Sequence, residues 1–506
     1  MYRKPPANQL AFENFDLPFG GKLNGENRWV RLAGLVPWEE VEAIYAKQFS
    51  EKAGAPAKPA RVAFGALLIK ERLGLGDEET VEQIRENPYL QYFLGFHGFS
   101  DEPPFDPSMF VYFRKRFSLE DLNRLNEIIA SGGLSLEETA ADDEGGDDDT
   151  GGSSGEDDSQ GRSSSSHPGN RGKLLLDATC APADIRYPTD IDLLNEARKK
   201  TEAIIDTLFE PLRGTRRKPR TYRRKARRAY VAFIKSGRRT GRARRKALRQ
   251  QLGYLKRNLS IIDELSEEVS LTLLSHHQYR NLLVIRELYR QQQWMYDHGS
   301  RRIADRIVSI SQPHIRPIVR GKAASPTEFG SKLSVSQVGG FAFLDRLDWN
   351  AYNESGDLIA QVEAYRRRFG HYPESVHVDK LYRTRANRAY CKERGIRLSG
   401  PPLGRPPKPS ETNEAELREQ ARQRHADEVA RIPIEGKFGQ AKRRFGLGRI
   451  MAKLPRTSEA SIAIIFIVMN LEKRLRQIFL AWISWLCAHR NGAQGRGGMG
   501  VACLAR

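Results

Sequence analysis

Three acidic residues occupy positions from which they could cleave a phosphodiester bond together. Asp177 follows the apolar run Leu174–Leu176, Asp379 follows Val376–Val378, and Glu435 opens the basic segment IEGKFGQAKRRFG. Metal-dependent cleavage uses carboxylates from separate elements to hold two divalent cations, which activate the attacking oxygen and stabilise the leaving oxygen. Magnesium prefers carboxylate oxygens. The three acids therefore predict a site for two Mg²⁺ ions, with Mn²⁺ as a possible substitute.

Two cations accompany the last of these acids. Arg431 and Lys442 lie four residues before and seven residues after Glu435, so on a single helix all three would share a face and could hold a scissile phosphate. The same pattern also fits a surface ladder of ion pairs. Pro433 offers another alternative, because proline inside a helix costs roughly 3 kcal/mol. A helix that begins at Pro433 would leave Arg431 outside it.

The elements expected to position these residues indicate an α/β domain over 172–487. KLLLDATCAPADIRYP predicts a strand, a turn and a second strand, and 330–347 predicts a hairpin that turns at Gly339-Gly340. Alternating helices and strands then follow, namely helix 358–370, strand 375–378, helix 384–394, strand 396–398 and helices over most of 413–487. This order predicts an α/β core that carries a helical insertion at 191–310.

The insertion contains the most basic part of the chain. Residues 213–257 include 20 Lys and Arg and no Asp or Glu, with Tyr and Phe interleaved. A charge run is usually a solvated face, but a stretch of this length would repel itself without a polyanion. We therefore expect the insertion to contact DNA, with four arginines as candidate phosphate ligands: Arg223, Arg224, Arg227 and Arg228.

Residues 1–135 predict several short helices with tight breaks between them. Asn87-Pro88 and Asp106-Pro107 are typical of helix starts. Short helices of this kind suit a helix-turn-helix-like DNA-binding domain, in which Arg114 and Arg116 would contact DNA. A small structural bundle is the alternative reading of the same pattern.

Composition and charge indicate the nature of the linker, the C-terminal tail and the cellular compartment. The net charge is +20, although 137–158 contain 11 acids and no bases, so we interpret 136–171 as a disordered acidic tether. Residues 488–506 predict a disordered tail. The four cysteines are scattered, which argues against a disulfide framework or a zinc site. We see no signal peptide or membrane segment and expect a cytoplasmic protein at the nucleoid.

Three blocks of the chain together resemble the DDE transposases of bacterial insertion sequences. These blocks are LLLDAT, HVDKLYRTRA and RIPIEGKFGQAKRR, and the resemblance is to the IS-five group within the IS-four superfamily. The last block of that group reads Y-(2)-R-(3)-E-(6)-K, which Arg431, Glu435 and Lys442 match with the right gaps. Glu428 stands at the tyrosine position. Further similarity lies in YPTDIDLLNEAR, EFGSKLSVS and DPSMFVYFRKRF.

The resemblance implies an RNase H-like mixed sheet flanked by helices. Asp177 would lie on its first strand, Asp379 on its fourth and Glu435 on a late helix. The implied activity is cleavage of double-stranded DNA at the element's ends and transfer of the 3′-OH strands to target DNA, by a homodimer assembled on DNA. Two alternatives stay open: a catalytically inactive, transposase-derived DNA-binding protein, and a structure-selective nuclease without strand transfer.

Overall fold

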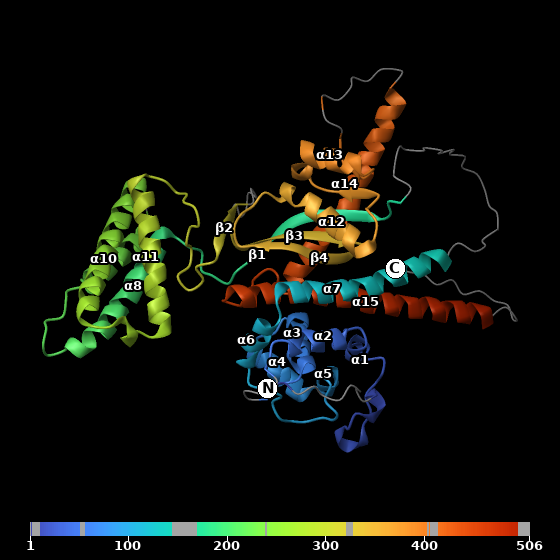
Figure 1. Ribbon diagram of the computed structural model, residues 1–506, viewed down its shortest axis with the longest axis horizontal. Coiled ribbons are helices and arrows are strands. Elements are labelled where there is room, and N and C mark those ends of the chain that lie inside the picture. The colour runs from blue at the N-terminus through green and yellow to red at the C-terminus, as the bar shows by residue number, and fades with distance from the viewer. Residues whose placement is uncertain are drawn as a thin grey trace.

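The chain forms three connected parts, which Figure 1 shows as a helical N-terminal part, a central sheet covered by helices, and a separate helical bundle. The computed structural model describes residue 2 and residues 11–50, 56–143, 169–237, 240–319, 327–401, 404 and 413–493. Residues 144–168 of the predicted tether and residues 494–506 of the predicted tail fall outside the described residues, and a helix, Pro455–Ala493, runs into the start of the predicted tail. The predicted α/β class is confirmed, with a mixed sheet consistent with an RNase H-like domain.

The N-terminal part consists of helices, as the sequence predicted. They are α1 (Arg28–Ala33), α2 (Trp38–Ala46), α3 (Ala60–Leu73), α4 (Asp77–Glu86), α5 (Pro88–Phe93), α6 (Met109–Arg116) and α7 (Leu119–Asp143). Pro88 occupies the first turn of α5, and the Asn87 side chain caps that helix by accepting a bond from the Tyr89 amide at 2.9 Å. Helix α7 continues past residue 135, where the sequence predicted the tether to begin.

The central sheet is mixed. Its strands are β1 (Lys173–Pro182), β2 (Arg316–Val319), β3 (Thr327–Val338), β4 (Phe341–Asp348), β5 (Ser375–His377) and β6 (Arg397–Leu398). The strand order is β2-β3-β1-β5-β6, with β4 also paired to β3. Strand β1 is antiparallel to β3 and parallel to β5, which is in turn parallel to β6. The predicted hairpin is confirmed, since Gly339 and Gly340 turn between β3 and β4 with φ of 50° and 76°.

The prediction of a strand, a turn and a second strand within KLLLDATCAPADIRYP was wrong. Strand β1 runs unbroken from Lys173 to Pro182, so Asp177 lies in its middle, opposite Val335. The reason is the partner strand: β3 supplies a continuous antiparallel ladder as far as Gly330, where an added Cβ would stand 2.0 Å from the Ala181 carbonyl oxygen. Because Gly330 has no side chain, the backbones of β1 and β3 can approach closely there and stay paired to the end of β1.

The two faces of the sheet are covered by different helices. The helices after β4 are α12 (Leu358–Phe369), α13 (Arg385–Glu393), α14 (Glu414–Arg444) and α15 (Pro455–Ala493). Leu174 and Leu176 pack with α12, whereas Val335 belongs to the core that includes Ala441 of α14. Since side chains alternate along a strand, Asp177 faces away from its two leucine neighbours and toward α14.

The predicted helical insertion is confirmed as a bundle with its own core, which stands apart from the sheet in Figure 1. Its helices are α8 (Asp190–Phe209), α9 (Arg223–Lys235), α10 (Gly241–Glu268) and α11 (His276–Asp297). In the part of the chain described here, no helix has the length and apolar character needed to cross a membrane.

One hydrophobic core joins the N-terminal helices to the end of the chain. Helix α15 packs against α3, α6 and α7, and Figure 1 shows α7 and α15 side by side along the sheet. The carboxylate of Glu472 on α15 binds Arg72 of α3 at 2.5 Å and Arg444 of α14 at 3.2 Å. Helix α15 therefore links the N-terminal helices to α14, the helix that carries Glu435.

Candidate active site

Asp177 and Glu435 converge on one cation. The Arg431 guanidinium lies 2.8 Å from a carboxylate oxygen of Glu435 and 3.9 Å from one of Asp177. The other oxygen of Asp177 accepts a bond from the Ala178 amide at 2.8 Å. The side chain of Asp177 is 19% exposed and that of Glu435 is 54% exposed, so the pair spans the boundary between the sheet and solvent.

Helix α14 runs without a break through Pro433, from Glu414 to Arg444. The alternative in which a helix begins at Pro433 is therefore wrong, and Arg431 and Glu435 do share a helical face. Proline is tolerated because it lies on the exposed side, where water can bond the carbonyl that loses its partner, while Ile434 and Ala441 are fully buried. Lys442 lies two turns beyond Glu435 and is half-buried, and Glu428 is exposed.

Asp379 lies two residues beyond the end of β5, on an exposed position at the start of the short helix η6 (Lys380–Tyr382). Its carboxylate accepts a bond from the Lys380 amide at 2.6 Å. Because β5 is parallel to β1 and adjacent to it, the strand delivers Asp379 to the part of the sheet where Asp177 lies. The resemblance placed Asp379 on the fourth strand, whereas the structure places it just beyond β5, the fifth strand along the chain and the parallel neighbour of β1.

Burial raises the pKa of Asp177 to about 6. The Ala178 amide and the Arg431 guanidinium act in the opposite direction, because both favour the charged carboxylate. Glu435 and Asp379 add to the increase by like-charge repulsion. The charges of Glu435 and Asp379 thus both favour the neutral form of the Asp177 carboxyl.

The raised pKa of Asp177 predicts that this residue lowers the free energy of unfolding in a pH-dependent way. The folded pKa of about 6 exceeds the unfolded value of about 3.9, so ionisation of Asp177 destabilises the metal-free fold as pH rises between these values, by about 3 kcal/mol in total. Asp177→Asn should match the wild type in melting temperature near pH 4 and exceed it increasingly up to about pH 6. Thermal melts in a chelator measure the difference, and a gap that stays constant across this range would contradict it.

The donor chemistry of the site fits a divalent cation. Among the residues that the structure describes, no three acidic, histidine or cysteine side chains stand together closely enough to form a metal site as they are. However, all three candidates are carboxylates, which hard cations prefer, and positive charge already lies between two of them in the form of Arg431. Asp177, Asp379 and Glu435 are thus the residues that would hold the ions.

Arg114 does not suit the DNA-binding role that the sequence suggested for it. It is 6% exposed, forms an ion pair with Asp77 of α4 and packs over the ring of Phe110. Four residues separate it from Phe110, so it shares the buried face of α6 rather than the outer one. Arg116 is half-buried, bonds the Gln48 carbonyl at 2.8 Å and stacks on a neighbouring ring.

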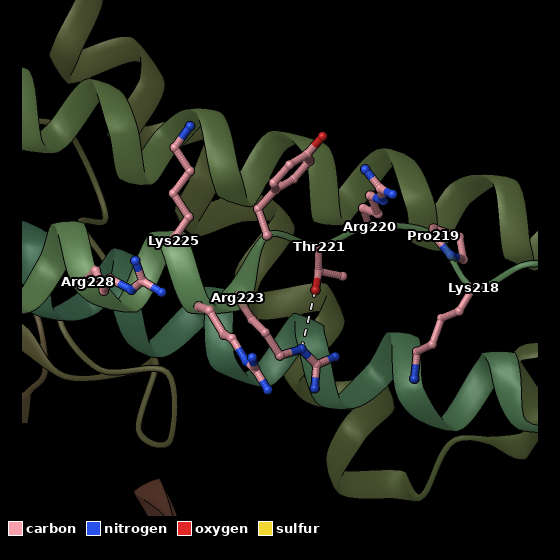
Figure 2. Close-up of a pocket in the computed structure, with 9 residues that line it drawn as sticks. Lys218, Pro219, Arg220, Thr221, Arg223, Lys225 and Arg228 are labelled. Carbon is pink, nitrogen blue, oxygen red and sulfur yellow. Dashed lines mark hydrogen bonds between the residues drawn. The ribbon is translucent and has the colours of Figure 1, made fainter.

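The predicted basic surface of the insertion is present on α9. Arg224, Arg227 and Arg228 are exposed, and they have no acidic partner in the described part of the chain. Arg223 is exposed too, but Asp206 of α8 binds it at 2.7 Å. Residues 218–225 and Arg228 line a hollow of about 760 Å³, which Figure 2 shows with its basic side chains extending from this one stretch of chain.

Sequence reasoning missed a buried cluster beside Asp379. His377 lies 3.6 Å from the Asp427 carboxylate of α14, and Arg397 of β6 binds both oxygens of that carboxylate at 2.9 Å. Burial lowers the pKa of His377, so Arg397 is the charged partner. One feature of the sequence could have indicated this cluster: Arg397 is a charged residue between two apolar residues, Ile396 and Leu398, in a predicted strand.

Comparisons with known proteins agree with this site. Residues 376–472 match the family described as a transposase DDE domain, a segment that contains Asp379, Arg431, Glu435 and Lys442. Residues 18–116 match the family described as a transposase domain, DUF772. Asp177 lies in neither matched segment. The uncharacterized protein ORF8 in the nfe locus of Rhizobium meliloti is 29% identical over 175 residues, covering 35% of this chain and 71% of that protein. No solved structure matches the chain.

Two separate segments of the chain, 18–116 and 376–472, thus match transposase families, and the second of them is a DDE domain that contributes to the mixed sheet. These matches agree with the resemblance of the three blocks to the DDE transposases of insertion sequences. A transposase DDE domain implies a nuclease and strand transferase that acts on DNA.

Proposed function

We propose that this protein cleaves the ends of its own insertion sequence and joins the freed 3′-OH strands to target DNA. The catalytic residues are Asp177, Asp379 and Glu435, and the cofactor is a pair of Mg²⁺ ions, with Mn²⁺ as a substitute. The observation that carries the proposal is the shared cation: acids from β1 and α14, far apart in the chain, meet at Arg431.

The side chains of the site divide the work. Divalent ions held by the three carboxylates supply an activated oxygen nucleophile and stabilise the leaving oxygen. Arg431 and Lys442 bind the scissile phosphate, so Arg431 exchanges its carboxylate partners for phosphate oxygens when DNA arrives. The low exposure of Asp177 keeps its charge poorly solvated, which strengthens its attraction for a cation.

DNA is held at two further places. The N-terminal helices read the end sequence, and the surface of α9 clamps the DNA backbone through Arg224, Arg227 and Arg228, with Arg223 beside them. The two ends are processed by a homodimer on double-stranded DNA. The protein acts in the cytoplasm, at the nucleoid.

The test uses the full-length protein and DNA that carries the element's own ends. We expect strand cleavage at the ends with Mg²⁺ and no cleavage in a chelator, followed by joining of the 3′-OH strands to a target duplex. Cleavage without joining would instead identify a structure-selective nuclease. Tight binding to the ends with no cleavage under any divalent cation would identify an inactive, transposase-derived DNA-binding protein.

The clamp on α9 makes a separate prediction. Replacing Arg224, Arg227 and Arg228 together by glutamine should weaken binding to any duplex by about tenfold or more and flatten the salt dependence of log K by up to about 3. Fluorescence anisotropy at several salt concentrations measures both quantities. Arg290→Gln is the matched control, because this exposed arginine of α11 is already paired with Glu287 at 2.7 Å. Equal salt slopes for the triple variant and the wild type would remove α9 from the DNA interface.

A further inference from the structure

Helix α14 carries a fourth acid that the proposed chemistry does not use. Asp427 is 6% exposed, and its carboxylate accepts two bonds of 2.9 Å from Arg397, one of 3.2 Å from Gln423 and one of 3.4 Å from the Gly400 amide. His377 lies 3.6 Å from it. A buried carboxylate with this many donors is fully satisfied and fixes the segment that carries it.

Most partners of Asp427 come from the edge of the sheet that also delivers Asp379. His377 lies on β5 two residues before Asp379, and Arg397 lies on β6, paired with Ser375 of β5. The Val378 amide, next to Asp379, donates to Ser399 at 3.1 Å, beside the same strand. One compact cluster therefore connects the second acid's strand to the third acid's helix.

The spacing of residues along α14 means that fixing Asp427 also fixes the positions of Arg431 and Glu435. Asp427, Arg431 and Glu435 follow at intervals of four residues, about 6 Å of rise each, on one side of the helix. Pro433 cannot donate the backbone bond that would tie the two turns around it together. The helix therefore needs an anchor on each side of the proline: Asp427 before it, and the fully buried Ile434 after it.

We propose that Asp427, paired with Arg397, is a positioning residue that sets the rotation and height of α14 against the sheet. It thereby presents Arg431 and Glu435 to Asp177 without touching substrate or metal itself. This inference rests on the proposed function, because it concerns the same three-acid site. Partners of this kind behind metal-binding side chains affect metal affinity or activity about 10- to 100-fold when removed.

The test compares Asp427→Asn with the wild type. Asparagine keeps the size of the side chain but loses the charge that binds Arg397. We expect the affinity of the DNA-free protein for Mn²⁺ to fall by about tenfold or more. The loss of the electron paramagnetic resonance signal of free Mn²⁺ measures this binding. Single-turnover cleavage at saturating end DNA should fall by a similar factor, with the affinity for end DNA within twofold. Arg397→Lys, which keeps the cation but loses the paired geometry, should give an intermediate effect.

The controls separate this inference from the proposed function. Glu414→Gln removes an acid from an exposed ion pair at the start of the same helix and should change none of these quantities. If the wild type cleaves and Asp177→Asn does not, while Asp427→Asn keeps wild-type Mn²⁺ binding and rate, the positioning role is wrong and the proposed function stands. If the wild type neither binds Mn²⁺ nor cleaves, the proposed function itself fails. Loss of folding in both Asp427→Asn and Arg397→Lys would also overturn the inference, since the pair would then support the fold rather than the site.

Discussion

Asp177→Asn should reduce cleavage of end DNA by at least about 10³-fold, because it removes the least exposed of the three carboxylates that would hold the ions. Asparagine has the same shape and can still accept the bond from the Ala178 amide, so the strand should stay intact. The affinity for end DNA should remain within about threefold of the wild type. Gel assays of cleavage and of binding, run on the same protein preparation, measure both.

A matched acid tests whether the loss is specific. Asp348 is the last residue of β4 in the same sheet, and its carboxylate binds Arg346 at 3.0 Å. Asp348→Asn should therefore cleave at close to the wild-type rate. Residual cleavage by Asp177→Asn above about a tenth of the wild-type rate would mean that this carboxylate does not hold the ions, and the three-acid site would have to be abandoned.

The parts of this site that could be predicted from the sequence are those encoded locally. Asp379 follows a short apolar strand, and the four-residue interval between Arg431 and Glu435 is a property of a single helix. Both are readable without knowledge of the rest of the fold. The hairpin at Gly339-Gly340 and the helix ending at Gly370 are local in the same sense, because glycine adopts the positive φ found there.

The failures came from partners that are distant in the chain. A turn was predicted within KLLLDATCAPADIRYP, but the residues from Asp177 to Pro182 continue the strand because β3 pairs with them. Arg114 looks like a surface cation until α4 places Asp77 against it. Helix α14 continues through Pro433 because burial of Ile434 and Ala441 outweighs the local cost of proline. In each case tertiary packing overrides a local preference that was read correctly.

Asp427 shows why the supporting residues of a site are the hardest to predict. A buried aspartate on a very polar helix has no distinguishing neighbours in sequence, and its partner Arg397 lies 30 residues away. The three candidate acids could be recognised from local sequence, because two of them follow short apolar runs and Glu435 lies four residues after Arg431. The proposed role of Asp427 can be inferred only from the folded structure, in which β5, β6 and α14 lie together.

Arg431→Gln should change metal binding and cleavage in opposite directions. In the DNA-free protein Arg431 supplies the positive charge between Asp177 and Glu435, so it competes with any divalent cation for the same two carboxylates. Removing a unit charge this close to two acids should tighten Mn²⁺ binding by about tenfold, which corresponds to about 1.4 kcal/mol. Cleavage should nevertheless fall by about 10²-fold, because the phosphate loses the cation that holds it in place.

Mn²⁺ titration of the DNA-free protein and single-turnover cleavage at saturating Mn²⁺ separate these two effects. Arg424→Gln is the control, because Arg424 lies on the same helix, is exposed and donates a bond of 3.1 Å to the Gln420 carbonyl of its own helix. A variant that bound Mn²⁺ no better than the wild type would show that Arg431 does not occupy the place of the ion. Both expected changes together would mean that DNA, by drawing Arg431 onto a phosphate, makes the carboxylates available to metal. The site would then acquire its full charge for catalysis only when a substrate phosphate is bound.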